Sequence, residues 1–212
     1  MSFFHLKKLK TTPRQARIYL FFAVLLIAAP TIMYKIVPSQ AGKMLVASGV
    51  MQGEPFEKTV IYLQSHHGYG AHGFIVNKPM SEADAKSLQF RFPMARRFHY
   101  GGPVGEGEVI SLLIPDAAQD NGFKILNVGT LSEKDVSAYN DLVTDAQLMR
   151  DAIVFSGYAG WSPFQLNREI MRGACNVIPY DPVYLEKRGQ RAIWDKAVDK
   201  ILDEKKDSLD PL

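Results

Sequence analysis

The hydrophobic positions divide the chain into one long apolar segment and a body of short alternating runs. Residues 18–34 carry no charge. From Pro38 onward, short stretches rich in β-branched and aromatic residues alternate with amphipathic stretches. This alternation, without an internal repeat, predicts one mixed unit of helices and strands behind an N-terminal apolar segment.

The strands of the body are predicted from apolar runs bounded by glycine, proline and polar residues. Alternating or continuously apolar patterns place them at 43–50, 59–64, 73–78, 109–114, 124–128 and 152–156.

The helices are predicted from their entry signals. A serine followed three residues later by an acidic residue or glutamine is a capping pattern, which predicts helices beginning after Ser81, Ser132 and Ser162. Pro163 at the first helical position supports the third of these, and Gly173 is expected to end it. The last helix is predicted over 190–204, followed by a disordered charged tail at 205–212.

The apolar segment has the length and the flanks of a membrane-spanning helix. Such a helix needs about 17 to 25 mostly apolar residues, and residues 18–37 contain a single charge, Lys35. Basic residues are concentrated in residues 1–17, so the positive-inside rule predicts that this terminus is cytoplasmic. We therefore expect a single-pass protein of the bacterial inner membrane with a periplasmic globular domain.

Two alternatives for the apolar segment stay open. The small residues of Ser39-Gln40-Ala41 have the spacing that a signal peptidase reads, so a cleaved signal is the first alternative. The apolar stretch exceeds the ~7 to 15 residues typical of cleaved signals, which favours a retained anchor or uncleaved signal at 18–37. A buried core helix is the second alternative, disfavoured because the segment is apolar on all sides.

Charge and cysteine content narrow the partners of the body. The chain has 25 basic and 22 acidic residues, a formal net charge of +3. Residues 1–35 hold six basic and no acidic residues, so the remainder has 19 basic against 22 acidic residues, or −3. An acidic body disfavours nucleic acid as a partner. The single cysteine, Cys175, excludes an intramolecular disulfide and a zinc site with two thiolates.

Residues 68–73 match the G-x-G-x-x-G pattern of dinucleotide-binding loops. In that fingerprint the third glycine lies in a helix, whereas here the following residues, 74–76, continue as a strand. A glycine-rich hairpin is therefore the preferred interpretation. His66, His67 and His72 in the same region are candidate metal ligands, but no carboxylate is near in sequence, so we expect solvent-exposed imidazoles and no metal or cofactor.

Three residues are candidate nucleophiles, with His99 as a candidate base. Ser156 lacks the glycine that a nucleophile elbow requires two positions earlier. Ser162 is explained as a helix cap, and Cys175 lies in an apolar run where a small buried residue is typical. The sequence therefore assigns no catalytic residue.

Two glycine-rich segments, residues 100–105 and 157–161, combine glycines with aromatic residues. Glycine permits close backbone approach, and the second segment directly precedes a predicted helix with free N-terminal amides. Together they suggest an anion or peptide pocket. The alternative is a pair of tight turns that pack Tyr158 and Trp161 into the core.

Five segments, in this order, carry a family resemblance: Gly42–Ala47, Phe56–Tyr62, Gly70–Pro79, Tyr100–Val104, and Gly157–Trp161 with Gln165-Leu166. They resemble the YqgE/AlgH family of bacterial proteins over about residues 42–202. The resemblance implies a single α+β domain, here 42–204, with a mixed central β-sheet flanked by helices. The family has no established catalytic activity, and one member has been linked to transcriptional control of exopolysaccharide synthesis. Its members typically begin near Gly42, so residues 1–41 are an addition in this chain.

These observations lead us to expect a membrane-anchored accessory or binding module without catalysis. The alternatives are a transcription-linked regulator of the family type and an uncharacterised hydrolase that uses the glycine-rich turns. The expected partners are the lipid bilayer, through residues 18–37, and a protein in or at the membrane. The candidate binding surface comprises Asn77, Lys78, Gly101, Gly102, Pro103, Tyr158, Trp161 and Gln165.

Overall fold

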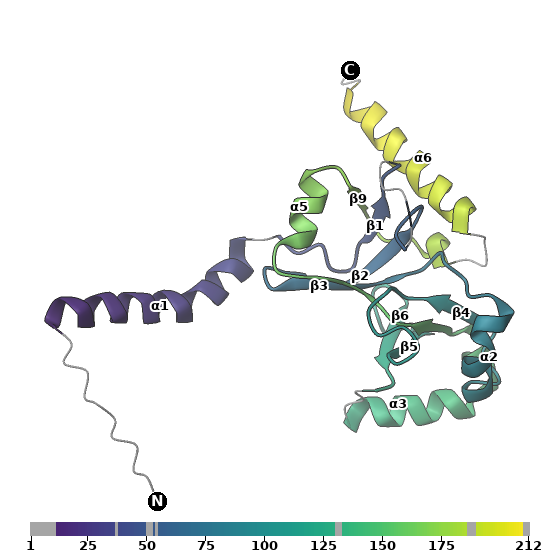
Figure 1. Cartoon of the computed structure of the whole chain (residues 1–212). Coiled ribbons are helices and arrows are strands. Elements are labelled where there is room, and N and C mark those ends of the chain that lie inside the picture. Colours follow the sequence, from purple (N-terminus) through teal and green to yellow (C-terminus); the bar gives the residue numbers. More distant parts are fainter. Residues whose placement is uncertain are drawn as a thin grey trace, which may run out of the picture.

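The computed structural model describes residues 12–36, 38–49, 53, 55–129, 133–185 and 190–209, without the side chains of 26–36, 133–138 and 207–209. The described residues form one α+β body, from which a long N-terminal helix extends (Figure 1). Instead of the single mixed sheet that we expected, the body contains two sheets.

The first sheet has five antiparallel strands in the order β8-β3-β2-β1-β9. Its members are β1 (Met44–Ala47), β2 (Val60–His67), β3 (Gly70–Ile75), β8 (Ala159–Trp161) and β9 (Cys175–Ile178). The strands β2 and β3 form a hairpin whose last pair is His67 with Gly70. Gly73, the third glycine of the G-x-G-x-x-G pattern, lies inside β3, which confirms the hairpin interpretation.

The second sheet has four strands in the order β4-β7-β5-β6 and is mixed, because β4 and β7 are parallel while the other pairs are antiparallel. Its members are β4 (Arg97–Tyr100), β5 (Ile110–Pro115), β6 (Phe123–Asn127) and β7 (Ile153–Ser156). The chain passes from this sheet to the first at the turn between β7 and β8.

The body helices are α2 (Glu82–Arg91), α3 (Glu133–Thr144), α4 (Ala146–Asp151), α5 (Gln165–Met171) and α6 (Gln190–Leu209), with a short 3₁₀ helix η1 (Pro182–Leu185). The cap predicted for α2 is confirmed, since the Ser81 hydroxyl accepts a hydrogen bond from the Asp84 amide. The cap predicted at Ser132 lies outside the described residues. The last helix continues past Glu204, where we expected it to end, to Leu209.

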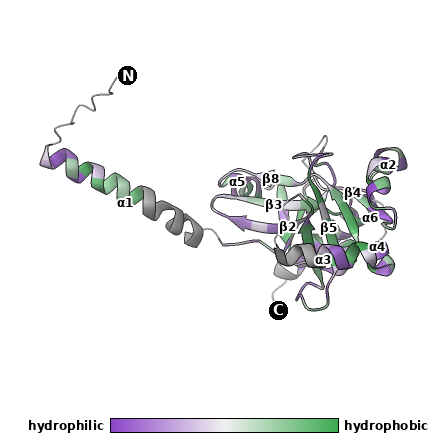
Figure 2. Ribbon diagram, turned by 90° about the horizontal axis from the view of Figure 1, so that it is seen from below, coloured by the Kyte–Doolittle hydropathy of each residue, from purple (hydrophilic) through white to green (hydrophobic). Residues whose placement is uncertain are grey.

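Three hydrophobic clusters make the body a layered structure. The strands β1 and β2 each contribute side chains to two of these clusters. Met44 and Val60 face the second sheet and α6, whereas Leu45 and Ile61 face α5. The third cluster lies between the second sheet and helices α2, α3 and α4. In Figure 2 the hydrophobic strands lie in the middle of the body, with the more hydrophilic helices outside. This layering explains the continuously apolar strands, because both of their faces are buried.

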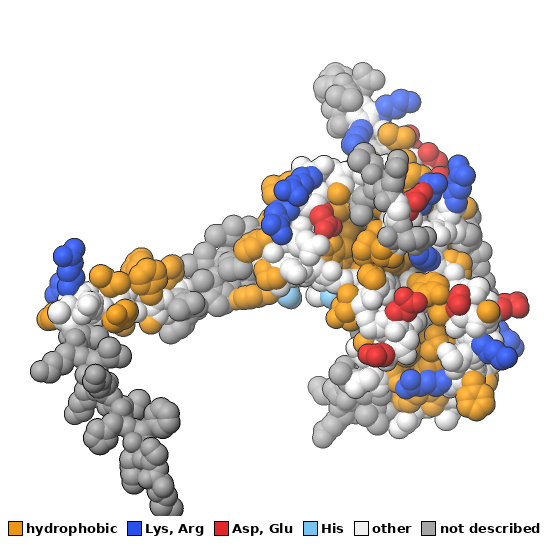
Figure 3. Space-filling model, in the orientation of Figure 1, with side chains coloured by type: hydrophobic (Ala, Val, Ile, Leu, Met, Phe, Trp, Pro, Cys, Tyr) orange, Lys and Arg blue, Asp and Glu red, His pale blue; other side chains and the backbone are white. Residues whose placement is uncertain are grey.

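Helix α1 (Pro13–Ile36) stands clear of the body, and its apolar side chains at 18–25 are exposed (Figures 1 and 3). The predicted membrane span 18–37 reaches into residues 26–37, whose side chains lie outside the described part. Within the described residues, none of the helices combines the length and the apolar content that a membrane crossing needs.

Candidate functional site

A small cavity of about 80 Å³ lies between α5 and the five-stranded sheet. The apolar part of its wall comes from strands β1, β2 and β9 and from the loop before β2, and its polar part comes from β8 and α5. The lining residues are Leu45, Ala47, Phe56, Thr59, Ile61, Gly160, Trp161, Gln165, Glu169 and Cys175. We call this cavity the α5 pocket.

The fold builds the apolar wall from side chains that alternate along the strands. Leu45 and Ile61 are buried neighbours in adjacent strands and point to the α5 side of the sheet. Leu166 of α5 packs into the same cluster and holds the helix against the sheet. A largely apolar cavity with a few ordered polar groups is the usual form of a small-molecule site.

The polar side of the α5 pocket is ordered by hydrogen bonds. The Trp161 indole N–H donates to Glu169 Oε2 at 2.9 Å, and Gln165 Nε2 donates to Glu169 Oε1 at 2.9 Å. Gln165 Oε1 in turn accepts from the Ser162 amide at 3.1 Å. The three side chains that meet the cavity are therefore held in one arrangement.

Cys175 lines the α5 pocket as a buried thiol, as its mainly apolar surroundings in the sequence predict. Burial, and to a smaller extent the Glu169 carboxylate, raises the pKa of the thiol to about 12. Because the thiolate is the nucleophilic form, this environment opposes nucleophilic chemistry at Cys175.

Helix α5 begins later than its entry signals predict. Ser162 was expected as the N-cap, but the N-cap is Phe164, in the left-handed region at φ 57°, and the helix starts at Gln165. Gln165 still bonds the Ser162 amide, which is half of a capping box. Gly173, at φ 69°, follows the helix as predicted.

The eight residues of the predicted binding surface do not meet in one place. Trp161 and Gln165 line the α5 pocket, whereas Tyr158 and Trp161 border a shallow hollow with the β2–β3 hairpin. Lys78, Gly102 and Pro103 border another hollow.

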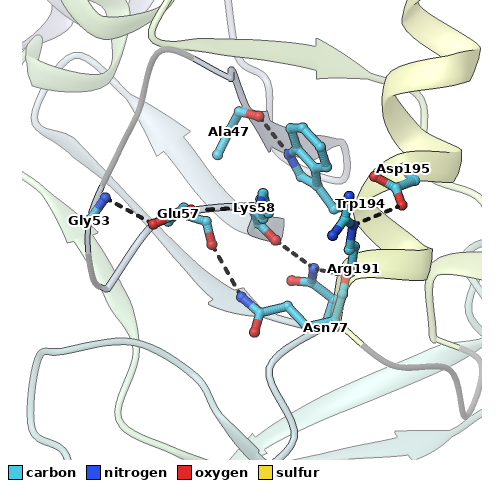
Figure 4. A network of polar contacts seen from close by, with 9 residues as sticks. Ala47, Gly53, Glu57, Lys58, Asn77, Arg191, Trp194 and Asp195 are labelled. Carbon is cyan, nitrogen blue, oxygen red and sulfur yellow. Dashed lines mark hydrogen bonds and ion pairs between the residues drawn. The ribbon is translucent and has the colours of Figure 1, made fainter.

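Asn77 is fully buried and joins α6 to the first sheet (Figure 4). Its side-chain oxygen accepts from the Val60 amide at 2.8 Å. Its Nδ2 donates to the carbonyl oxygens of Lys58 at 2.9 Å and Gln190 at 2.8 Å. All of these contacts are internal, so this structure gives Asn77 a structural role.

Gly101 and Gly102 lie where two backbone segments cross. A Cβ on Gly101 would be 2.1 Å from the Gly157 carbonyl oxygen, and one on Gly102 would be 2.2 Å from the Tyr158 carbonyl carbon. The amide of Val104 donates to the Tyr158 carbonyl, and the reverse bond is also formed, both at 3.0 Å. The two glycine-rich segments thus form a tight crossing between the sheets.

Lys78 and Tyr158 contact aromatic rings beside the shallow hollows. The Lys78 ammonium lies 5.8 Å from the centroid of the Tyr100 ring. Tyr158 packs on His72, with ring centroids 4.4 Å apart. Both hollows are more open to solvent than the α5 pocket.

The histidines are more enclosed than expected. His66 and His99 are buried, and burial is the main cause that lowers the pKa of His66, His72 and His99, that of His99 to about 4. His66 Nδ1 accepts from the Gln40 amide at 3.0 Å, so its Nε2 carries the proton and donates to Asn167 Oδ1 at 3.3 Å. Over the described part of the chain, no cluster of three His, Cys, Asp or Glu side chains could hold a metal ion.

The serine candidate is also engaged in the structure. Ser156 is buried at the end of β7, and its hydroxyl accepts a hydrogen bond from the Gly107 amide at 2.9 Å. Its neighbour in the parallel strand is Tyr100, and the candidate base His99 pairs with Phe155 instead.

The sequence interpretation missed Glu169 and the apolar wall of the α5 pocket. Glu169 is four residues after Gln165 on the predicted helix, and this spacing brings two side chains together on one helical face. That signal was available. The apolar wall was not, because the pairing of β1 with β2 and β9 joins segments far apart in the chain.

The fold places the chain in a known structural class. It is similar to the solution structure of the AlgH protein from Pseudomonas aeruginosa, with a TM-score of 0.53 at 23% identity over 75% of this chain and 87% of that one. It is also similar to a crystal structure of a Corynebacterium diphtheriae protein, with a TM-score of 0.58 at 23% identity over 77% and 90% of the two chains.

The chain belongs to the AlgH-like family (DUF179), whose sequence profile matches residues 44–205. It is 30% identical to a UPF0301 protein of Methylobacterium sp. (strain 4-46), over 76% of this chain and 82% of the relative. It is 33% identical to a UPF0301 protein of Pelodictyon phaeoclathratiforme, over 75% and 85%. The family expectation is confirmed, and residues 1–43 lie outside the matched region.

Proposed function

We propose that this protein is a binding module that takes up a short apolar group of its ligand in the α5 pocket. The observation that carries the proposal is the combination of an apolar cavity with a hydrogen-bonded wall of Trp161, Gln165 and Glu169. The apolar wall would favour an alkyl group, and the ordered polar side chains would orient it without a large loss of side-chain entropy.

Binding without catalysis fits the surroundings of the candidate nucleophiles. The Cys175 thiol has a pKa raised to about 12, and the Ser156 hydroxyl is buried and hydrogen-bonded to a backbone amide. The glycine-rich turns are occupied by a backbone crossing, which weakens the hydrolase alternative.

A filled pocket tests the proposal. Replacing Ala47 by Leu adds an alkyl group to the cavity wall, and Ala192→Leu makes the same change on an exposed face of α6. With the full chain in lipid nanodiscs, we expect isobutanol to shift the NMR signals of the Trp161 indole and the Ile61 methyls. The Ala47→Leu variant should lose this response, and Ala192→Leu should keep it. An equal response in both variants would place the probe elsewhere.

A second proposal concerns α1, which would anchor the domain in the bacterial inner membrane. Seven of its side chains between 18 and 25 are large, hydrophobic and 45–65% exposed, without a covering partner in the described residues. Exposed apolar surface of this kind is typical of a membrane or protein contact. The basic residues before it favour a cytoplasmic N-terminus and a periplasmic domain.

The outer face of α5 supports this proposal. Phe164, Arg168, Met171 and Arg172 are exposed and spaced so that they lie on one side of the helix. Figure 3 shows basic and hydrophobic side chains together over α5. The segment between α1 and β1 is connected to α5 through His66, so α5 lies beside the segment that leads from α1 into the body. Apolar and basic side chains together suit an anionic lipid surface.

Cell fractionation tests the anchor. We expect the full chain to sediment with membranes and to resist extraction at high salt, because apolar transfer rather than charge holds it. Replacing Leu20 and Val24 by Lys should release the protein into the soluble fraction. The control, with Lys at the exposed Phe90 and Leu202 of the body, should stay with the membranes. Recovery of the unaltered chain in the soluble fraction would contradict the anchor.

A further inference from the structure

The lining of the α5 pocket carries a negative charge at one position. Glu169 is its one charged member, and the nine other lining residues are neutral. An acidic group at the edge of an apolar cavity sets which ligands can enter, because an anion would lose its hydration and meet a like charge.

Among the described residues, Glu169 receives hydrogen bonds from neutral donors and forms no ion pair with a cation. Each carboxylate oxygen accepts one N–H, from Trp161 and from Gln165, and a carboxylate has acceptor capacity beyond two such bonds. The ion pairs found among the described residues do not include Glu169. The nearest arginines in sequence, Arg168 and Arg172, are on the exposed side of α5.

Glu169 and Cys175 belong to two different elements of the pocket wall, α5 and β9. Cys175 belongs to β9, on the sheet side of the pocket, and the Glu169 carboxylate is the second cause, after burial, that raises the pKa of its thiol. A group bound in the α5 pocket would therefore lie near the Glu169 carboxylate.

We infer that the α5 pocket prefers a short alkyl group that bears an ammonium, with the alkyl part against Leu45 and Ile61 and the ammonium at Glu169. The inference rests on the proposed binding function and adds the charge of the ligand to it. A cavity of about 80 Å³ limits the buried part to a small group. An ammonium has three N–H donors. One of them can bond to an acceptor site of the Glu169 carboxylate that Trp161 and Gln165 leave free.

Three small probes that share an isopropyl group test the charge preference with the full chain in lipid nanodiscs at pH 7.5. They are isobutylamine, which is an ammonium at this pH, isobutanol and isobutyrate. Binding is followed at the Trp161 indole N–H, which reports on the carboxylate that it contacts. We expect isobutylamine to bind at least tenfold more tightly than isobutyrate, with isobutanol between them.

Glu169→Gln removes the charge and keeps an oxygen that can accept from Trp161. In this variant the affinities for isobutylamine and isobutyrate should agree within about twofold. Glu108→Gln removes an exposed carboxylate away from the pocket lining and should keep the tenfold preference. The peptide Leu-Gly-Gly-amide separates two sources of the ammonium. Binding of this peptide at the same site would indicate a protein N-terminus, and binding of isobutylamine alone would indicate a free amine.

The outcomes separate this inference from the broader proposal. Equal binding of the three probes at the pocket, or an amine preference that survives in Glu169→Gln, would overturn the charge inference and leave the pocket as a binding site. The absence of any response at Trp161, Leu45 and Ile61 would overturn both.

Discussion

The Asn77 side chain is the clearest case of a structural polar residue in this protein. Its three hydrogen bonds join the first residue of β2, Lys58 in the loop before that strand and the start of α6, and all lie inside the fold. Replacing Asn77 by Ala leaves a buried amide and two carbonyls without these partners, so we expect a loss of about 3 kcal/mol in the free energy of unfolding.

Urea denaturation of Asn77→Ala and Asn127→Ala measures this difference. The Asn127 side chain accepts a single hydrogen bond, from the exposed Gly129 amide at 3.0 Å, so Asn127→Ala should cost less than about 1 kcal/mol. Equal losses in the two variants would show that the Asn77 contacts contribute little.

The close backbone approach at Gly101 and Gly102 leaves no room for a side chain. Gly101→Ala would place its Cβ 2.1 Å from the Gly157 carbonyl oxygen, and the backbone has to move to relieve the contact. We expect a loss of about 3 kcal/mol or more, within the range of severe core changes. Gly49→Ala meets open space and should change stability by less than about 0.5 kcal/mol. Thermal unfolding by circular dichroism compares the two, and a similar melting temperature for both would contradict the crossing.

A sequence alone does not decide whether a glycine or an asparagine binds a ligand or stabilises the fold. Gly101, Gly102 and Asn77 occur in segments rich in functional signals, and the same residue types serve ligands or backbone packing. The partner decides between these roles, and here the partners are Gly157, Tyr158 and Val60, which are distant in the chain. Cys175 was predictable as a buried thiol, because it lies in a mainly apolar run from Ala174 to Ile178.

At the scale of elements, the sequence located most strands to within a few residues. The apolar runs at 109–114 and 152–156 became β5 and β7. The short strands β4, β8 and β9 escaped prediction, because three or four residues carry too little periodicity and their conformation depends on pairing with distant strands.

The start of helix α5 is held by the side chain of Gln165. The Gln165 side chain joins the turn before the helix to Glu169 within it. Gln165→Ala removes both contacts, and we expect a loss of about 1 kcal/mol, typical of a lost cap. Gln147→Ala, on the exposed start of α4, loses side-chain bonds to Arg150 and Asp151 and should cost less than about 0.5 kcal/mol. Urea midpoints measure both, and no loss in Gln165→Ala would remove its role in ordering the pocket.

At the scale of the whole molecule, buried histidines predict acid sensitivity. In the folded state the pKa values of His66, His72 and His99 lie below their ordinary value, so the unfolded chain binds protons more readily. Their contribution to stability is present above the ordinary pKa of about 6.5 and is lost as the pH falls towards the folded pKa.

For His99, with a folded pKa of about 4, the loss between pH 7 and pH 4.5 is about 2.5 kcal/mol. His99→Gln cannot titrate and should show a pH dependence weaker by about this amount. Urea unfolding of both proteins at the two pH values is the measurement. An unchanged pH dependence in the variant would show that His99 is not the group that titrates.

The sequence predicted an α+β body but placed its strands in one sheet. Local patterns show which faces are apolar, and they do not show which distant strands pair. The strands β1, β2 and β7 are apolar on both faces. This pattern fits a single sheet covered on both sides and equally fits two stacked sheets. The chain changes sheets twice, between β3 and β4 and between β7 and β8, and no local pattern marks either change.

The proposed function requires that the α5 pocket binds the alkyl part of a small ligand. Intermolecular nuclear Overhauser effects between bound isobutylamine and the full chain test this claim most directly, because they locate the probe. We expect contacts from the probe methyls to the methyl groups of Leu45 and Ile61 and to the Trp161 ring. Contacts confined to His72 and Tyr158, at the shallow hollow, or to α1 would contradict it.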